Sequence, residues 1–337
     1  MLKKIIFGLV LSLLFTAKAT AQDTHFSQQY ANKLHLNPAF AGIRSPYSIT
    51  GTYRNQWPTL DGSFITNQIA ADLRFNDQKS AIGFTAMYDK TGSIGFTRIQ
   101  ANGYYAYHTP LTDQFSLSGG LTAGYGSQKY DFDNLIFGDQ LSNNGAFNPV
   151  TAEQLGTETA RYFTVSTGTV FYTDQFWLSL AGFHLNQPDA GFGTVAKLPA
   201  RIALNTGYKF FVSGSYQKGK LEEFSFTPTI TYMQQGGSKK LDLGLYTTYT
   251  PFTFGLIYRG INTGSDFGYD KSLVTIFGVT LEQFKVGYSY DIGLSGLSSR
   301  SGGSHEVSLT FDNVDVTKTF KKSTSAKNYR RIACPAF

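Results

Sequence analysis

The feature that most constrains this chain is a hydrophobic pattern of period two, which recurs from about residue 47 to residue 313. Residues 116–125 show the pattern: serine, threonine or glycine occupies every second position, and the positions between them are Leu117, Gly119, Leu121, Ala123 and Tyr125. Residues 224–232 and 284–291 repeat the alternation. Because successive side chains of a β-strand point to opposite faces, each segment has one apolar face and one small, polar face. The pattern predicts an all-β fold.

Fourteen segments of this kind can be counted, at residues 47–57, 63–75, 80–89, 94–109, 114–130, 161–173, 176–187, 198–212, 224–235, 240–250, 252–261, 271–282, 284–294 and 303–313. Every second join is short, with residues 214–223 as a longer exception, whereas the joins between them are mostly long. Short turns at one end and long loops at the other are typical of an outer-membrane β-barrel. Both termini are then expected at the short-turn, periplasmic end.

A soluble β-sandwich or propeller is the competing architecture, because its strands also alternate. The solvent face of a sandwich usually carries many charges, but only 15% of this chain is charged, against about 25% in ordinary domains. A closed barrel also leaves no strand edge unpaired in lipid. We therefore predict a 14-stranded antiparallel transmembrane β-barrel.

Eleven charged residues fall at the inward-facing positions of this barrel, and their signs are mixed. Because buried charges need partners, a wall network is favoured over an ion filter. These residues are Arg54, Asp72, Arg74, Arg98, Arg201, Lys209, Asp242, Arg259, Lys285, Asp291 and Glu306.

The two ends of the chain differ from its body. Lys3 and Lys4 precede an apolar run that ends before Ala19-Thr20-Ala21, as in a secretory signal peptide. A buried N-terminal helix is the alternative. The predicted organisation is a signal peptide at 1–21 cleaved before Gln22, an N-terminal periplasmic or plug segment at 22–46, the barrel at 47–313 and a basic periplasmic tail at 314–337.

Motifs for catalysis, metals or cofactors are absent from the sequence. The five histidines are dispersed, there is one cysteine, and no Gly-rich phosphate loop or nucleophile elbow occurs. A hydrolase assembled from separate strands through His108 or His184 is a less favoured alternative. We predict no enzyme activity and no cofactor. The pI of about 9.1 comes from the two basic ends, so nucleic-acid binding is not expected either.

The longest join, residues 131–159, carries five acidic residues and neither lysine nor arginine. Loops of this length usually have a function or are disordered. An external loop that binds a partner or divalent ions and a merely solvated loop remain equally open.

Three stretches carry a family resemblance. Residues 23–42 read DTHFSQQYANKLHLNPAFAG, residues 53–58 read YRNQWP, and the chain closes with RRIACPAF. These stretches resemble the PorP/SprF family of outer-membrane proteins of the type IX secretion system. The resemblance implies a non-enzymatic component that supports secretion of cargo with C-terminal sorting domains. It favours a member devoted to one large adhesin of gliding motility. The implied partners are that surface adhesin, periplasmic type IX components and outer-membrane lipids.

The N-terminal motif is too apolar for a free periplasmic tail. The residue before a proline avoids helical geometry, so Asn37-Pro38 predicts a turn, and residues 27–36 are compatible with a short helix. We predict that residues 23–46 enter the barrel mouth as a plug; packing under the rim is the alternative. The residues expected to carry this role are His25, Phe26, Ser27, Gln28, Tyr30, Leu36, Asn37, Pro38, Ala39 and Phe40.

The tail, residues 314–337, combines a basic stretch with an apolar terminus. Its charges would steer it to an acidic surface, and its single thiol either bonds to a partner or stays free. The candidate partner-binding residues are Lys321, Lys322, Arg330, Arg331, Cys334 and Phe337. A tail lying on anionic lipid headgroups is the alternative.

Two functions of different classes follow. The leading one is a secretion and anchoring component that holds an adhesin at the outer membrane. The alternative is a plugged transporter for hydrophobic small molecules, which requires an apolar lumenal pocket and a lateral opening. A third function, as an adhesin that binds through the acidic loop, is less favoured than either of these.

Overall fold

The fold is taken from a computed structural model. It describes residues 23–75, 79–92, 95–130, 138–141, 151, 159–217, 220–261, 271–281, 283–294 and 301–313. The predicted signal peptide, most of the acidic loop and the basic tail lie outside the described residues. In the described part of the chain, no helix is long and apolar enough to cross a membrane.

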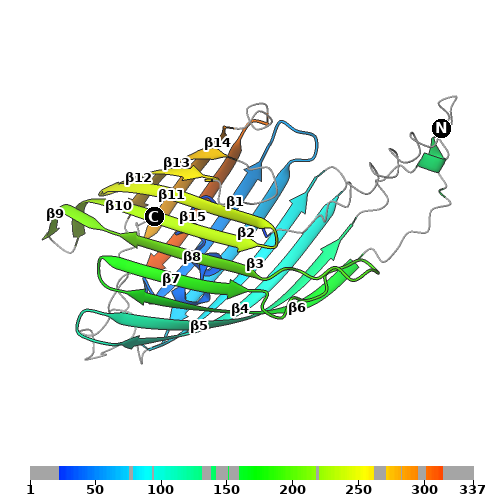
Figure 1. Cartoon of the computed structure of the whole chain (residues 1–337). Coiled ribbons are helices and arrows are strands. Elements are labelled where there is room, and N and C mark those ends of the chain that lie inside the picture. The colour runs from blue at the N-terminus through cyan, green and yellow to red at the C-terminus, as the bar shows by residue number, and fades with distance from the viewer. Residues whose placement is uncertain are drawn as a thin grey trace, which may run out of the picture.

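The described chain is almost entirely antiparallel β-sheet (Figure 1). Its strands are β1 (Tyr47–Gln56), β2 (Phe64–Arg74), β3 (Ser80–Thr91), β4 (Phe96–Pro110), β5 (Ser116–Lys129), β6 (Thr159–Tyr172), β7 (Phe176–Phe183), β8 (Arg201–Tyr208), β9 (Phe210–Gln217), β10 (Lys220–Gln235), β11 (Ser238–Tyr249), β12 (Phe252–Arg259), β13 (Ser272–Leu281), β14 (Phe284–Gly293) and β15 (Ser304–Asn313). Three short helices lie among the described residues: α2 (Lys33–Leu36), η1 (Pro38–Phe40) and η3 (Gly138–Gln140).

The sheet closes on itself, because β1 pairs with both β2 and β15. β8 and β9 are two halves of one strand: both pair with β10, and the register continues from Gly207↔Thr229 to Phe210↔Phe226. The wall therefore has the predicted fourteen strands. A closed antiparallel barrel is confirmed.

Most connections alternate in length, as the sequence predicted, although only two residues join β10 to β11 at the end of the longer loops. We call the end with the joins β2–β3, β4–β5, β6–β7, β11–β12 and β13–β14 the short-turn end, and the other the long-loop end. The predicted long exception at residues 214–223 is wrong, because β9 runs to Gln217 and β10 begins at Lys220. This hairpin pairs through its backbone without an alternating apolar face, so the hydrophobic pattern did not reveal it.

A second boundary also differs. The strand predicted over residues 176–187 ends at Phe183, and His184 adopts a left-handed backbone with φ of 53°. The side chain of Asn186 takes the place of a strand there: its Oδ1 accepts from Val165 N at 3.2 Å, and its Nδ2 donates to Phe163 O at 2.7 Å. The Asn186 side chain thus supplies hydrogen-bond partners to the β6 backbone at Phe163 and Val165 in place of a neighbouring strand.

The two faces of the wall have the expected polarity. In β5, Leu121 and Tyr125 are 62% and 51% exposed on the outer face, whereas Ser118 and Thr122 are buried on the inner face. All eleven charged residues predicted to face inward are buried. Ion pairs join several of them across strands, including Lys209 with Glu223 and Lys285 with Asp312. The predicted wall network is confirmed for the described residues.

The interior is occupied by the chain's own residues 23–46, which we call the lumenal segment (Figure 1). It contains α2 and η1, and its side chains form the apolar clusters at the centre of the barrel. The helix predicted over 27–36 is shorter, since only Lys33–Leu36 is α-helical.

Candidate functional site: the lumenal segment and its wall contacts

The lumenal segment runs along the height of the barrel. Asp23 contacts Arg98, His184 and Arg201, which all lie at the long-loop ends of their strands. Gly42 N donates to Asp72 at 2.7 Å near the short-turn end, where β1 begins. The prediction that both termini lie at the short-turn end is therefore wrong for the N-terminal side, because the described chain starts at the opposite end of the lumen. Wall charges at that end supply the partners that draw the segment inward.

Asp23 is the only acidic residue of the lumenal segment, and it meets a cluster of cationic and imidazole groups. Its carboxylate lies 2.9 Å from His184 Nε2, 3.4 Å from Arg201 Nε and 3.6 Å from Arg98 Nη1. Burial alone would raise the pKa of Asp23, but His184 and the arginines hold it well below its usual range. The charged carboxylate therefore fastens the start of the segment to the wall.

Thr164, His184 and Asp23 form a hydroxyl–imidazole–carboxylate series, since His184 Nδ1 lies 2.7 Å from Thr164 Oγ1. This is the order of groups in a hydrolase triad. However, Thr164 is only 1% exposed, so its hydroxyl has no room for a substrate. The series holds the end of β7 against β6 and the lumenal segment.

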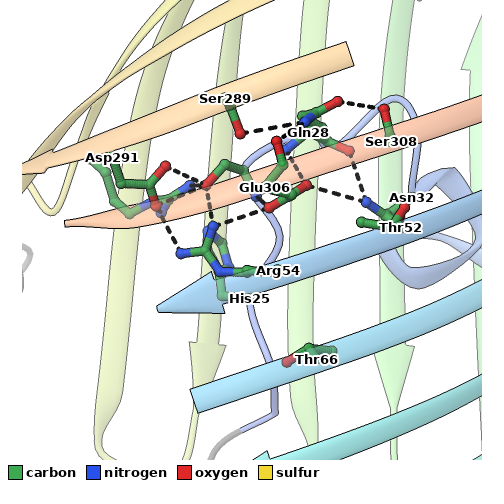
Figure 2. A network of polar contacts seen from close by, with 12 residues as sticks. His25, Gln28, Asn32, Thr52, Arg54, Thr66, Ser289, Asp291, Glu306 and Ser308 are labelled. Carbon is green, nitrogen blue, oxygen red and sulfur yellow. Dashed lines mark hydrogen bonds and ion pairs between the residues drawn. The ribbon is translucent and has the colours of Figure 1, made fainter. Parts of the chain in front are cut away.

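A second anchor lies at Ser27 and Gln28 (Figure 2). The two consecutive backbone N–H groups donate to the two oxygens of the Glu306 carboxylate, at 2.7 and 2.9 Å. Arg54 Nη1 lies 3.0 Å from Glu306, and its Nη2 lies 2.7 Å from Asp291. Ser27 Oγ completes the network by donating to Asp291 at 2.7 Å. Because Glu306 is fully buried, its carboxylate needs charged and hydrogen-bonding partners. Arg54 and these two N–H groups supply them.

The histidines of the segment are held neutral. Burial, reinforced by nearby Arg259, lowers the pKa of His25 to about 3. Burial and Arg201 lower the pKa of His35 to about 3 as well. His35 Nε2 lies 2.9 Å from the Arg201 guanidinium. Neither imidazole adds charge to the lumen near neutral pH.

The predicted turn at Asn37-Pro38 is present and initiates η1. Asn37 Oδ1 accepts from Ala39 N at 2.8 Å, which caps the helix, and Pro38 occupies its first turn. The Asn37 amide also donates to Ser179 Oγ at 2.8 Å and to the carbonyl of Leu180 at 3.1 Å. One side chain therefore both shapes the turn and fixes it to the wall.

Glycines in the wall permit this close approach. A Cβ added at Gly120 would collide with the backbone of Pro38 and Ala39, and one at Gly168 would collide with the Asn37 side chain. Gly119, the outward-facing neighbour of Gly120, has open space around its Cβ position.

Replacement of Gly120 by valine should therefore displace η1 from the wall, at a cost of about 1–3 kcal/mol from overpacking. Gly119→Val is the matched control on the same strand and should be close to neutral. The midpoint of the heat-induced mobility shift on gels, together with protease sensitivity of the lumenal segment, measures both variants. Equal behaviour of the two variants would contradict this account.

All ten predicted motif residues lie in the lumenal segment. His25 is partly buried and the other nine are buried. The predicted tail residues, from Lys321 to Phe337, lie outside the described residues.

Two anchors of the segment were not predicted from its sequence: Asp23, and the backbone N–H groups of Ser27 and Gln28 at Glu306. Asp23 was detectable as the sole acid of the segment facing a wall with several arginines. Two residues of the YRNQWP motif also make contacts in the structure. Arg54 belongs to the network around Ser27 and Glu306, and Trp57 N donates to Gly303 O at 2.8 Å at the rim.

Several solved barrels resemble this fold. The Ralstonia pickettii toluene transporter TbuX has a TM-score of 0.46 and 10% identity, with 84% of this chain and 93% of that chain covered. A Pseudomonas aeruginosa FadL homologue has a TM-score of 0.40 and 12% identity, with 82% and 92% covered. At such values the likeness implies nothing about substrate. No curated protein matches the chain.

The model of one protein family matches most of the chain. Residues 18–311 fit the family described as type IX secretion system membrane protein PorP/SprF. The match includes the lumenal segment and nearly the whole barrel. Together with the closed barrel, it indicates a secretion or transport component of the outer membrane rather than an enzyme. The chain belongs to the PorP/SprF family of type IX secretion system membrane proteins.

Proposed function

We propose that this outer-membrane type IX secretion component supports the secretion and surface anchoring of one large adhesin used in gliding motility. The observation that carries the proposal is the filled lumen. Among the described residues, two cavities beside the lumenal segment hold only about 20 Å³ each, roughly the space of one water molecule. A barrel with this interior is suited to holding partners rather than passing solutes.

In this proposal the lumenal segment is a plug. Its polar atoms are tied to the wall by charge-assisted hydrogen bonds at Asp23 and at Ser27, and its apolar side chains fill the centre. Closure of the pore would let the cell keep an export-associated barrel in its outer membrane without leakage.

The tail, residues 314–337, is proposed to dock the barrel to periplasmic components of the secretion system. Its basic stretch includes Lys321, Lys322, Arg330 and Arg331, which suits an acidic partner surface. The chain enters this tail from Asn313 at the short-turn end, the end that outer-membrane barrels direct to the periplasm. Outer-membrane lipids would contact the exposed apolar face of the wall.

Isolation of the tagged barrel from membranes, followed by mass spectrometry, tests the cargo proposal. We expect one large surface protein with a C-terminal sorting domain to co-purify. Variants that displace the lumenal segment, such as Gly120→Val, show whether recovery depends on a seated segment. Recovery of lipids alone would contradict the anchoring function.

The alternative of a transporter for hydrophobic small molecules needs an apolar pocket. The cavity lined in part by Tyr30, Leu36, Phe40 and Ile43 is apolar enough, but its volume of about 20 Å³ excludes a hydrocarbon of useful size. The small volume of this cavity therefore favours the anchoring proposal.

A further inference from the structure

The hairpin of β9 and β10 extends beyond the rest of the barrel wall at the short-turn end (Figure 1). β10 pairs with β11 only as far as Phe224, but it continues to pair with β9 as far as Lys220. Four residues of rise correspond to roughly 13 Å. On the opposite edge of the strand formed by β8 and β9, β7 pairs only as far as Tyr208. One further bond joins this edge to the turn between β6 and β7, from Lys209 N to Gln175 O at 2.8 Å.

The outer edge of β9 has no strand partner among the described residues. Regular alternation between buried and exposed side chains also ends there, since Phe210, Phe211 and Val212 are 53%, 46% and 58% exposed in succession. The sequence of β9, FFVSGSYQ, contains neither a charged residue nor a proline. Natural sheets protect their free edges with those residue types, so an apolar edge without them marks a pairing site.

A second copy of the chain does not fit this edge. Two barrels in one membrane are related by an axis along the membrane normal. With strands tilted about 40°, a strand and its symmetry mate would cross at about 80°, which precludes a β-ladder. The occupant must therefore be a segment free to orient itself.

We propose that the occupant is the end of the chain's own tail, residues 328–337, which adds to β9 as a further strand. The tail starts where β15 ends, at the same short-turn end as the hairpin. Its residues 314–337 reach roughly 80 Å when extended, whereas a 14-stranded barrel is about 28 Å across. The chain can therefore cross the barrel mouth and still supply a strand.

The composition of this segment fits the position. It reads NYRRIACPAF, with Tyr329, Ile332 and Phe337 as apolar or aromatic anchors beside the exposed residues of β9. It also carries Arg330, Arg331 and Pro335, the residue types that blunt a free edge. Addition of the tail converts an unprotected edge into a protected one. It also fixes the basic stretch before residue 328 across the periplasmic mouth, where a partner can reach it.

The single cysteine of the chain, Cys334, makes the proposal testable by disulfide formation in the purified full-length barrel. Ser213→Cys places a second thiol on β9. Leu111→Cys and Leu281→Cys place exposed thiols on other turns of the same rim as matched controls. Under mild oxidation, the bond from Cys334 to residue 213 should form at least tenfold faster than the bonds to the controls. Equal rates, or bonds formed only between molecules, would overturn the proposal.

Backbone hydrogen exchange provides a second measurement without new thiols. In the full-length chain the outward N–H groups of β9 should be protected, and removal of residues 328–337 should speed their exchange at least tenfold. Rapid exchange in the full chain, or protection that survives the truncation, would exclude the tail as occupant. Both measurements use the isolated barrel, so their failure is distinct from failure to recover an adhesin.

Discussion

Deletion of residues 23–46 should convert a barrel with a filled lumen into a conducting pore, with single-channel current rising by roughly tenfold or more over the intact protein. The reason is geometric: a 14-stranded barrel is wide enough to hold water once its interior is vacated. The segment now occupies that space with buried side chains such as Phe26, Leu34 and Phe40. Planar bilayer recordings and sensitivity of cells to large antibiotics measure the effect.

The barrel should survive this deletion because its strand ladders and several of its wall ion pairs do not involve the segment. Arg54 remains paired with Asp291 and Glu306, and Arg259 remains paired with Asp291. Water would solvate Arg98 and Arg201 after the loss of Asp23. Retained heat-modifiability on gels is the folding control. Unchanged permeability in a folded deletion variant would count against the plug.

Truncation after Asp315 should leave a folded barrel but abolish surface display of the adhesin. The truncation removes no described strand, because β15 ends at Asn313. It does remove every basic residue of the tail and its apolar terminus. Loss of these charges should eliminate attraction to an acidic partner, an effect that salt also weakens. Antibody labelling of intact cells measures the display.

A charge-only variant separates docking from length. Replacement of Lys321, Lys322, Arg330 and Arg331 by glutamine keeps the tail but removes four charges. If electrostatic docking dominates, display should fall nearly as far as in the truncation. Ordinary display by the truncated protein would exclude a docking role altogether.

The sequence by itself determined the wall of this protein. Strand side chains alternate with period two whatever surrounds them, so the alternation alone assigns Leu121 and Tyr125 to the outer face and Arg54 and Glu306 to the inner face. The mostly alternating join lengths likewise indicated which turns lie together at the short-turn end. The Asn37-Pro38 turn was predictable for the same reason, because its geometry depends on adjacent residues alone.

Only the tertiary structure decided how the interior is filled. Pairing of Glu306 with the N–H groups of Ser27 and Gln28 joins residues nearly the whole chain apart, and no local pattern encodes such a contact. The direction of the lumenal segment depends on the cluster around Asp23, which exists only after β4, β7 and β8 have come together. The β9–β10 hairpin escaped prediction for a related physical reason: backbone hydrogen bonds form it beyond the wall, where no buried face imposes a pattern on the side chains.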